Sequence, residues 1–177
     1  MIKHVLSGEI MASYEKHFHE IDPVYDAHSR ILILGSFPSV KSREQRFFYG
    51  HPQNRFWKVI ATVTDSPVPG TVEEKKILLL SHQIALWDVI QSCDIEGSSD
   101  ASIKNVVPNP VGDILKKTRI EKIFGNGAKA CGLYDRYLFP DIKIPIIRLP
   151  STSPANAAYS FERLVEAWSI INLWDKR

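Results

Sequence analysis

Hydrophobic and polar positions along the chain form short apolar runs separated by longer amphipathic stretches. Four of the apolar runs have the length of strands, at residues 31–34, 84–90, 120–124 and 144–149. The first run, Ile31-Leu32-Ile33-Leu34, is apolar at every position. This is typical of a central parallel strand that is buried on both faces of its sheet.

Five stretches between and after these runs carry the signals of helices, at residues 52–63, 71–82, 113–118, 128–138 and 157–174. Pro52 suits a first helical position because its missing N–H would have no partner there. Thr71 followed by Glu74 has the pattern of a capping box, which predicts that a helix begins there. Strands and helices therefore alternate along the chain.

This alternation predicts an α/β fold, with three α/β/α layers around a mostly parallel four-stranded central sheet. We expect one domain over residues 21–177, preceded by an N-terminal arm at residues 1–20 of unknown role. In open α/β sheets, ligands bind beyond the carboxyl ends of the strands. Four predicted loops leave that edge, at residues 36–51, 91–111, 125–128 and 150–156.

Composition narrows the class of protein. The 177 residues suit one domain, and 44% hydrophobic with 24% charged residues are ordinary values for a soluble globular protein. The net charge of +2 excludes a polybasic nucleic-acid coat protein, although a local basic patch remains compatible with it. Basic residues do gather after the first strand, at Lys41, Arg43, Arg46, Arg55 and Lys58, and in a second run at Lys116, Lys117, Arg119 and Lys122.

The two cysteines, Cys93 and Cys131, form no CxxC pair, so a four-cysteine metal cluster is excluded and we expect free thiols. Residues 1–20 lack the apolar core of a signal peptide, and no stretch reaches the roughly 20 apolar residues of a membrane span. We therefore expect a cytoplasmic protein with no membrane partner, no metal and no cofactor. Phosphate-binding P-loops, dinucleotide-binding GxGxxG patterns and GxSxG nucleophile elbows are also missing from the sequence.

Two of the loops at the predicted ligand edge have unusual compositions. Residues 35–39 read Gly-Ser-Phe-Pro-Ser and are followed by Phe-Tyr-Gly-His-Pro-Gln-Asn-Arg-Phe-Trp at residues 48–57. Residues 149–156 read Leu-Pro-Ser-Thr-Ser-Pro-Ala-Asn. A loop with two prolines and three hydroxyls is preorganised, and its small side chains and amides suit a phosphate backbone that approaches closely.

On the basis of these motifs, the chain resembles the uracil-DNA glycosylase superfamily over roughly residues 21–174. The GSFPS run resembles the first motif of that superfamily, HPQNRFW resembles the HPxNRFW stretch of the mismatch-specific members, and LPSTSP resembles the second motif. The runs at residues 85–90 and 97–100 add to the match. Uracil-specific members carry Asn or Asp where this chain has Phe37, whereas the hypoxanthine-DNA glycosylase branch lacks that polar residue and is thought to use the HPxN asparagine, here Asn54.

The resemblance also implies which residues form the site. Asn54 would be catalytic through its amide, with capping of a turn as the alternative. Independently of the resemblance, Asp88 lies near the carboxyl end of a predicted strand, where it would accept a hydrogen bond from a purine ring N–H or be a buried structural carboxylate. His51 would contact a phosphate or only support its loop. Tyr49 would stack on the extruded base, with Gly35, Ser36 and Phe37 around it. The phosphate contacts and loop tip would come from Ser151, Thr152, Ser153, Pro154 and Ala155.

The function that the resemblance implies is a monofunctional DNA glycosylase, which flips a deaminated base out of DNA and hydrolyses its N-glycosidic bond. We expect release of hypoxanthine from deoxyinosine in double- or single-stranded DNA, by a monomer. Neither motif contains a lysine, so we expect no strand-nicking lyase activity. Two alternatives remain: excision of uracil from G·U mismatches or of xanthine, and a catalytically inactive DNA- or nucleotide-binding module.

Overall fold

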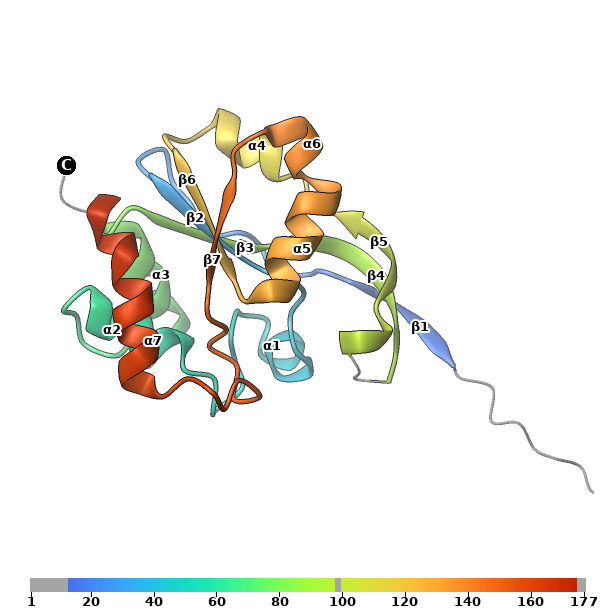
Figure 1. Cartoon of the computed structure of the whole chain (residues 1–177), viewed down its shortest axis with the longest axis horizontal. Helices are drawn as coiled ribbons and strands as arrows, with labels where there is room; N and C mark the ends of the chain where they lie inside the picture. Colours follow the sequence, from blue (N-terminus) through green and yellow to red (C-terminus); the bar gives the residue numbers. More distant parts are fainter. Residues whose placement is uncertain (1–12, 98–99, 175–177) are drawn as a thin grey trace, which may run out of the picture.

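The computed structural model describes residues 13–97 and 100–174, so residues 1–12 of the expected arm lie outside the described residues (Figure 1). Its centre is a four-stranded sheet in the order β3-β2-β6-β7, and all three strand pairs are parallel. The strands are β2 (Ile31–Gly35), β3 (Ile84–Asp88), β6 (Lys122–Asn126) and β7 (Ile146–Leu149). Strands β2 and β3 are buried at every position, as expected for strands covered on both faces.

Helices cover both faces of this sheet and complete the three expected layers (Figure 1). Helices α2 (Phe56–Val63), α3 (Val72–Ser81) and α7 (Phe161–Trp168) lie on one side, and α5 (Ala128–Tyr137) lies on the other. The capping box at Thr71 and Glu74 is confirmed at the start of α3. Shorter elements complete the chain: α4 (Val111–Lys116), α6 (Phe139–Ile142) and a final 3-10 turn at Ser169–Trp174.

The prediction of a loop at residues 91–111 is wrong, because most of this segment belongs to a second sheet. Strand β3 ends at Asp88, and the chain continues as β4 (Ile90–Glu96), a 3-10 turn and β5 (Lys104–Pro108). Together with β1 (Tyr14–Phe18), these strands form an antiparallel sheet in the order β1-β4-β5. An antiparallel sheet with one exposed face needs few apolar residues, so β5 has no continuous apolar run to indicate it.

The first loop also contains an element that the hydrophobic pattern does not indicate. Helix α1 (Val40–Gln45) begins after Ser39, whose side chain accepts a hydrogen bond from the Ser42 N–H. The following helix begins at Phe56, four residues later than Pro52 suggests. Residues 51–54 form a turn instead, closed by the hydrogen bond from Asn54 N to His51 O. The Asn54 side chain therefore lies just ahead of α2.

Strand β1 packs the described part of the expected arm against the domain. It pairs with β4 over Tyr14 to Phe18, in register with Glu96 to Ser92. The chain then passes the carboxyl end of β3, where the side chain of His19 contacts Asp88. In the described part of the chain, no helix is long and apolar enough to cross a membrane.

Candidate active site

A cleft of about 890 Å³ runs along the carboxyl edge of the four-stranded sheet. This volume lies within the range of small-molecule binding sites, which is roughly 300–1,000 Å³. The first loop, the segment that follows β6 and the loop at residues 150–156 all contribute to its lining. The structure brings all twelve predicted site residues to this cleft: Gly35, Ser36, Phe37, Tyr49, His51, Asn54, Asp88, Ser151, Thr152, Ser153, Pro154 and Ala155.

The side chain of Asn54 is held in one orientation. Its Oδ1 accepts hydrogen bonds from the Phe56 N–H (2.9 Å) and from the hydroxyl of Thr152 (2.9 Å). An amide oxygen has two lone pairs, so both are in use. Among the described residues nothing accepts from the Asn54 Nδ2, and Asn54 therefore presents a hydrogen-bond donor, rather than an acceptor, to the cleft.

Thr152 does not have the predicted role of a phosphate ligand, because its side chain is completely buried. Its hydroxyl donates to Asn54 and accepts from the Asn126 Nδ2 (3.0 Å), while its backbone N–H donates to the Asn126 Oδ1 (3.0 Å). The chain of contacts Asn126–Thr152–Asn54, which we call the Asn54 network, links the end of β6 to the segment before α2. Thr152 thus positions Asn54.

Arg55 has a similar structural function, although it belongs to the basic group that the sequence places beside the first loop. Its guanidinium donates to the backbone carbonyls of Tyr159 (2.5 Å), Ser153 (3.0 Å) and Asn156 (3.0 Å). The backbone N–H of Arg55 donates to the backbone carbonyl of Thr152 at 3.1 Å. These bonds hold the loop at residues 150–156 against the start of α2, so Arg55 is occupied by protein carbonyls.

Gly35 ends β2 directly beneath Asp88 and Tyr49. A Cβ atom at Gly35 would lie 2.3 Å from the Asp88 Oδ1 and 2.9 Å from the Tyr49 hydroxyl oxygen. Both distances are shorter than van der Waals contact, so only glycine allows the two side chains to approach the strand this closely. Gly35 therefore shapes the floor of the cleft without contributing a side chain.

Tyr49 adopts a left-handed backbone conformation (φ 52°) and stacks on Phe56, with ring centroids 4.1 Å apart. The residue is half-buried and lines the cleft, but its hydroxyl group is buried. Burial, and to a lesser extent the nearby Asp88 carboxylate, raises the pKa of Tyr49, and the side chain of Asn126 offsets only part of this rise. Tyr49 therefore stays neutral and offers an aromatic ring to the cleft.

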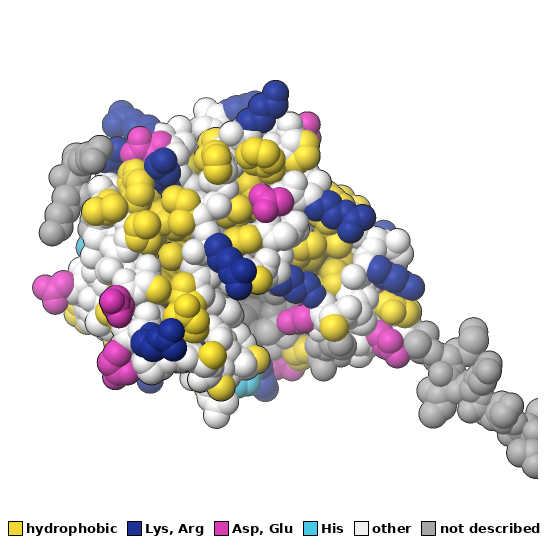
Figure 2. Space-filling model, in the orientation of Figure 1, with side chains coloured by type: hydrophobic (Ala, Val, Ile, Leu, Met, Phe, Trp, Pro, Cys, Tyr) yellow, Lys and Arg dark blue, Asp and Glu magenta, His cyan; other side chains and the backbone are white. Residues whose placement is uncertain are grey.

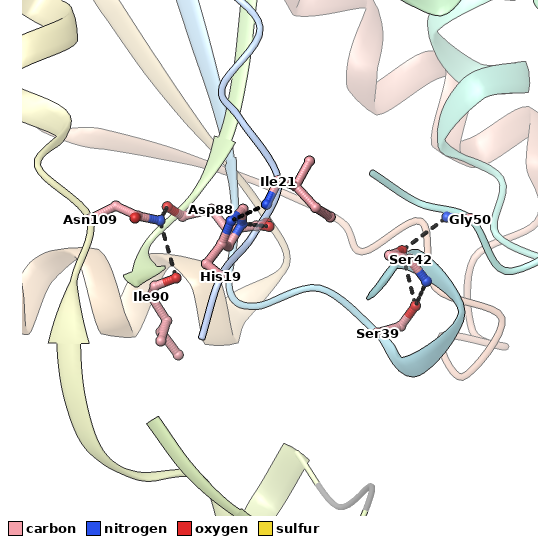
Figure 3. A network of polar contacts seen from close by, with 8 residues as sticks. All are labelled: His19, Ile21, Ser39, Ser42, Gly50, Asp88, Ile90 and Asn109. Carbon is pink, nitrogen blue, oxygen red and sulfur yellow. Dashed lines mark hydrogen bonds and ion pairs between the residues drawn. The ribbon is translucent and has the colours of Figure 1, made fainter. Parts of the chain in front are cut away.

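Asp88 belongs to a second polar group, drawn in Figure 3, which we call the Asp88 network: His19, Asp88 and Asn109. The His19 Nε2 lies 2.7 Å from the Asp88 Oδ2, and the two side chains are 1% and 5% exposed. The buried Asn109 amide donates to the backbone carbonyls of Asp88 (2.9 Å) and Ile90 (3.1 Å). Asp88 is thus fixed at both its side chain and its backbone while its carboxylate lines the cleft.

The remaining residues of the first loop lie as walls and rims. Phe37 is half-buried, with the edge of His19 against its ring (6.1 Å) and the Arg43 guanidinium over it (5.7 Å). Ser36 is held by the bond from Ile90 N to its carbonyl. His51 accepts from Gln53 N through Nδ1 (3.1 Å), so in the neutral ring the proton is on Nε2, which can donate to a ligand.

The tip of the second loop is preorganised by its own hydroxyls. The Ser151 Oγ accepts from Ser153 N, and the Ser153 Oγ accepts from Ala155 N, each at 3.2 Å. Each hydroxyl keeps its hydrogen for a further acceptor. Pro154 and Ala155 are exposed at the tip. This arrangement is compatible with the predicted contacts of Ser151 and Ser153 to phosphate.

Several residues that line the cleft were not predicted as site residues from the sequence. Asn126 ends β6, Lys129 lies in the first turn of α5, and Arg148 lies on β7, next to the second loop. The Lys129 ammonium donates to the Asp100 carbonyl. The Gly-Asn-Gly run at residues 125–127, placed at a strand end, is a signal that could have indicated Asn126. His19 gives no such signal, because only the pairing of β1 brings it to the site.

Charge is distributed without one dominant patch on the face shown in Figure 2, where basic side chains alternate with acidic and apolar ones. The second basic run lies at the opposite edge of the sheet from the cleft, because Lys122 begins β6. Two of its members have protein partners, Asp113 for Lys116 and the Trp174 ring for Lys122. Among the described residues, no group of three or more His, Cys, Asp or Glu side chains could hold a metal ion.

The three-layer fold and the cleft at the carboxyl edge, with its fixed amide and carboxylate, are features of an α/β enzyme that binds a polar ligand beyond the ends of its strands. The family model "Uracil DNA glycosylase superfamily" matches residues 23–172, and the chain belongs to this superfamily. The resemblance seen in its motifs is thereby confirmed.

Individual relatives agree with this assignment. The chain is 34% identical over 153 residues to a hypoxanthine DNA glycosylase of Methanosarcina acetivorans, covering 84% of this chain and 93% of the relative. It is 33% identical over 119 residues to one of Methanosarcina barkeri, covering 66% and 74%. A solution NMR structure of a candidate uracil DNA glycosylase from Methanosarcina acetivorans superposes with a TM-score of 0.75, at 31% identity, over 87% of this chain and 96% of that one.

Proposed function

We propose that this protein is a monofunctional DNA glycosylase that releases hypoxanthine from deoxyinosine in DNA. The observation that carries the proposal is the pair of polar groups in the cleft, a fixed donor on Asn54 and a carboxylate on Asp88, next to the ring of Tyr49. The relatives named hypoxanthine DNA glycosylase support the choice of base, because the match covers nearly the whole length of one of them.

Each group has a role in the proposed reaction. The deoxyinosine nucleotide leaves the helix and its flat base stacks on Tyr49, beside Phe37. The Asp88 carboxylate accepts the hydrogen bond of the purine ring N–H. The bond between C1′ and the ring nitrogen then breaks, so that positive charge develops on the sugar and negative charge on the departing base.

The donor on Asn54 acts at this point. Its Nδ2–H bonds to the departing base and stabilises the negative charge that develops there, close to the N-terminus of α2. Water adds to C1′, its hydroxyl completes the abasic sugar, and its remaining proton goes to the base. Because the Asn54 oxygen is already occupied by two donors, we assign it no role in activating this water.

The DNA backbone is held from two loops in this proposal. The Ser151 and Ser153 hydroxyls and the His51 Nε2–H donate to phosphates flanking the flipped nucleotide, and Pro154 and Ala155 occupy part of the vacated space. Contacts of this kind do not depend on base sequence and weaken as salt concentration rises. We also propose that the enzyme works as a monomer in the cytoplasm, on double- or single-stranded DNA.

A panel of oligonucleotides tests the proposal. Each carries one deoxyinosine, deoxyuridine opposite G, deoxyxanthosine or undamaged adenine, in single- and double-stranded form, and is treated with alkali after incubation. We expect the deoxyinosine strand to be cleaved fastest and the adenine strand to stay intact. Faster cleavage at uracil or xanthine would replace the proposed substrate, and DNA binding without any abasic sites would identify a binding module.

The same panel tests the absence of lyase activity. Strands incubated without alkali should remain intact, and borohydride should trap no covalent adduct. Lys129 is the cleft residue to examine if an adduct does form, because its amine lines the cleft. A Lys129→Ala variant that abolished trapping would then assign the adduct to it and overturn the monofunctional mechanism.

A further inference from the structure

His19 is buried against the proposed site, although it lies in the segment that follows β1 and is 69 residues distant from Asp88 in the sequence. Its Nε2 is 2.7 Å from the Asp88 Oδ2, and its side chain is 1% exposed (Figure 3). A buried polar pair of this kind costs free energy unless its hydrogen bonds are made. The contact therefore needs an explanation within the site.

The protonation of the ring follows from its two neighbours. The His19 Nδ1 accepts a hydrogen bond from the Ile21 N–H at 3.3 Å, so in the neutral ring the proton lies on Nε2 and is donated to Asp88. Three aromatic side chains surround the imidazole, with centroid distances of 6.1 Å to Phe37, 6.0 Å to Phe48 and 6.4 Å to Trp87. This packing leaves the ring little freedom to turn.

The bond from His19 decides which oxygen of Asp88 is free. Among the described residues, His19 is the only side chain that donates to the Asp88 carboxylate, and it binds Oδ2. The other oxygen, Oδ1, lies above Gly35 on the side of the Tyr49 hydroxyl. Asp88 lines the cleft, and because His19 occupies Oδ2, Oδ1 is the carboxylate oxygen left without a side-chain donor among the described residues.

An acceptor at this position distinguishes hypoxanthine and uracil from their parent bases, adenine and cytosine. Deamination of adenine or cytosine converts a ring nitrogen with a lone pair into an N–H group, which a carboxylate oxygen accepts. The lone pair of adenine would instead face the carboxylate and repel it. A site built to bind an N–H group discriminates strongly against an analogue that lacks it.

We infer that His19 is a positioning residue for base recognition, which holds Asp88 so that Oδ1 faces the base as a hydrogen-bond acceptor. The inference rests on the proposed function. Without its donor, the buried carboxylate would lose the contact that fixes Oδ2 and would turn toward solvent, so the acceptor at this position would be lost. His19 is not among the residues that line the cleft, so its effect passes through Asp88.

A double-mutant cycle tests this inference in the full-length protein. The variants are His19→Leu, Asp88→Asn and their combination, and the readouts are the single-turnover rate on deoxyinosine duplex at saturating enzyme and the Kd for that duplex. We expect His19→Leu to lower the rate by about tenfold to a hundredfold, as for the loss of a hydrogen bond to a charged group. In the Asp88→Asn background the same change should lower the rate by less than about twofold, because the partner is already altered.

Two matched variants separate positioning from general damage. His19→Gln keeps an N–H donor and should recover the rate to within about fivefold of the wild type. His17→Leu changes the same residue type two positions earlier, on β1, where the imidazole contacts Arg43, and should lower the rate by less than about threefold. The Kd should stay within about threefold for the His19 and His17 single variants, since neither side chain is proposed to touch DNA.

Clear results overturn the inference. It is wrong if His19→Leu acts as strongly in the Asp88→Asn background, if His17→Leu costs as much, or if His19→Gln recovers nothing. Should His19→Leu fail to fold, the pair His19→Gln and His19→Asn decides instead, because the shorter Asn amide does not reach Asp88 and equal losses would contradict positioning. A wild-type protein inactive on deoxyinosine refutes the proposed function separately, and the cycle is then run on the lesion that it does release.

Discussion

Asn54 and Asp88 are fixed in the same cleft in similar ways but offer it opposite groups. In the Asn54 network, the amide oxygen is occupied by the Phe56 N–H and the Thr152 hydroxyl, so the nitrogen remains as a donor. In the Asp88 network, one carboxylate oxygen is occupied by His19, so the other remains as an acceptor. In both cases the neighbours determine which atom is left for a ligand.

The two networks differ in where their members come from. The partners of Asn54 are Phe56 at the start of α2 and Thr152 in the loop after β7, and Thr152 is bonded in turn by Asn126 at the end of β6. These segments meet at the predicted ligand edge of the main sheet. The partner of Asp88 comes from the segment after β1, in the antiparallel sheet that the hydrophobic pattern does not indicate. The Asn54 network is thus built from segments of the main α/β domain, whereas the Asp88 network depends on the second, antiparallel sheet.

The largest expected effect is on the donor. Asn54→Asp keeps an oxygen for the Phe56 N–H and the Thr152 hydroxyl but replaces the amide nitrogen, so it should lower the single-turnover rate on deoxyinosine by roughly 10²–10³-fold. Asn54→Ala should lose at least as much and also some stability, because it removes a side chain that bonds the start of α2. An active Asn54→Asp enzyme would show that the donor is not what Asn54 contributes.

The acceptor is tested through the glycine beneath it. In Gly35→Ala the new Cβ would lie 2.3 Å from the Asp88 Oδ1, so we expect a loss of about 2 kcal/mol in the free energy of unfolding and at least about a tenfold lower rate. Gly112→Ala is the control, because nothing lies within 4 Å of its Cβ position. It should leave the rate unchanged and stabilise the protein by about 0.5 kcal/mol, as measured by chemical denaturation. Equal behaviour of the two variants would remove Gly35 from the site.

A smaller effect is expected at the buried hydroxyl that connects Asn54 to Asn126. Thr152→Val keeps the shape of the side chain but loses both hydroxyl contacts, so the rate should fall by about tenfold and the free energy of unfolding by about 1–3 kcal/mol. Thr152→Ser retains the hydroxyl and should keep the rate while losing about 1 kcal/mol of packing. If both variants lost activity equally, the methyl group rather than the hydroxyl would be what matters.

The smallest effect concerns the hydroxyl of Tyr49. Tyr49→Phe keeps the stack on Phe56, so the rate should stay within about threefold of the wild type, whereas Tyr49→Ala should lose the stacking of the base, worth about 1–3 kcal/mol. If the Tyr49→Phe enzyme had the low activity of the alanine variant, the hydroxyl would have a chemical role.

The same variant should change how stability depends on pH. Folding raises the pKa of Tyr49, so its contribution to stability is fully present below the unfolded pKa, about 10, and is lost as the pH rises above it. Urea unfolding between pH 9 and pH 11 should therefore show a smaller alkaline loss for Tyr49→Phe than for the wild type. Cys93, whose pKa burial raises to about 11, contributes equally to both proteins, so the difference isolates Tyr49.

Much of the main sheet could be predicted because β2 and β3 are apolar at nearly every position and β6 and β7 each contain a short apolar run. Residues 31–34 lie in β2 as expected, and the other three predicted strands overlap β3, β6 and β7. The second sheet could not be predicted from apolar runs. The side chains of β1 and β5 are exposed or partly exposed, and the sequence around β1 has no periodic hydrophobic pattern. The prediction that α2 begins at Pro52 was wrong. The Asn54 side chain accepts a hydrogen bond from the Phe56 N–H, so the helix begins at Phe56 and a turn precedes it.

The candidate site was predicted better than the roles within it. Loop composition and motif resemblance led to residues that all line one cleft, yet Thr152 and Arg55, assigned to phosphate or to a basic patch, are occupied by protein groups instead. A hydroxyl or guanidinium looks the same in a sequence whether it faces solvent or a backbone carbonyl. Burial, which depends on the packing of distant segments, decides between the two.

The sequence by itself determined the α/β architecture, the edge of the sheet that carries the site and the residue types available there. These features follow from local hydrophobic periodicity and from loops that must follow strand ends. Only the tertiary structure decided that Asn54 presents its nitrogen, that Thr152 and Arg55 face inward, and that His19 meets Asp88. Hydrogen bonds between segments that lie far apart in the chain fix these orientations, because a buried polar group is stable only when it has a hydrogen-bond partner.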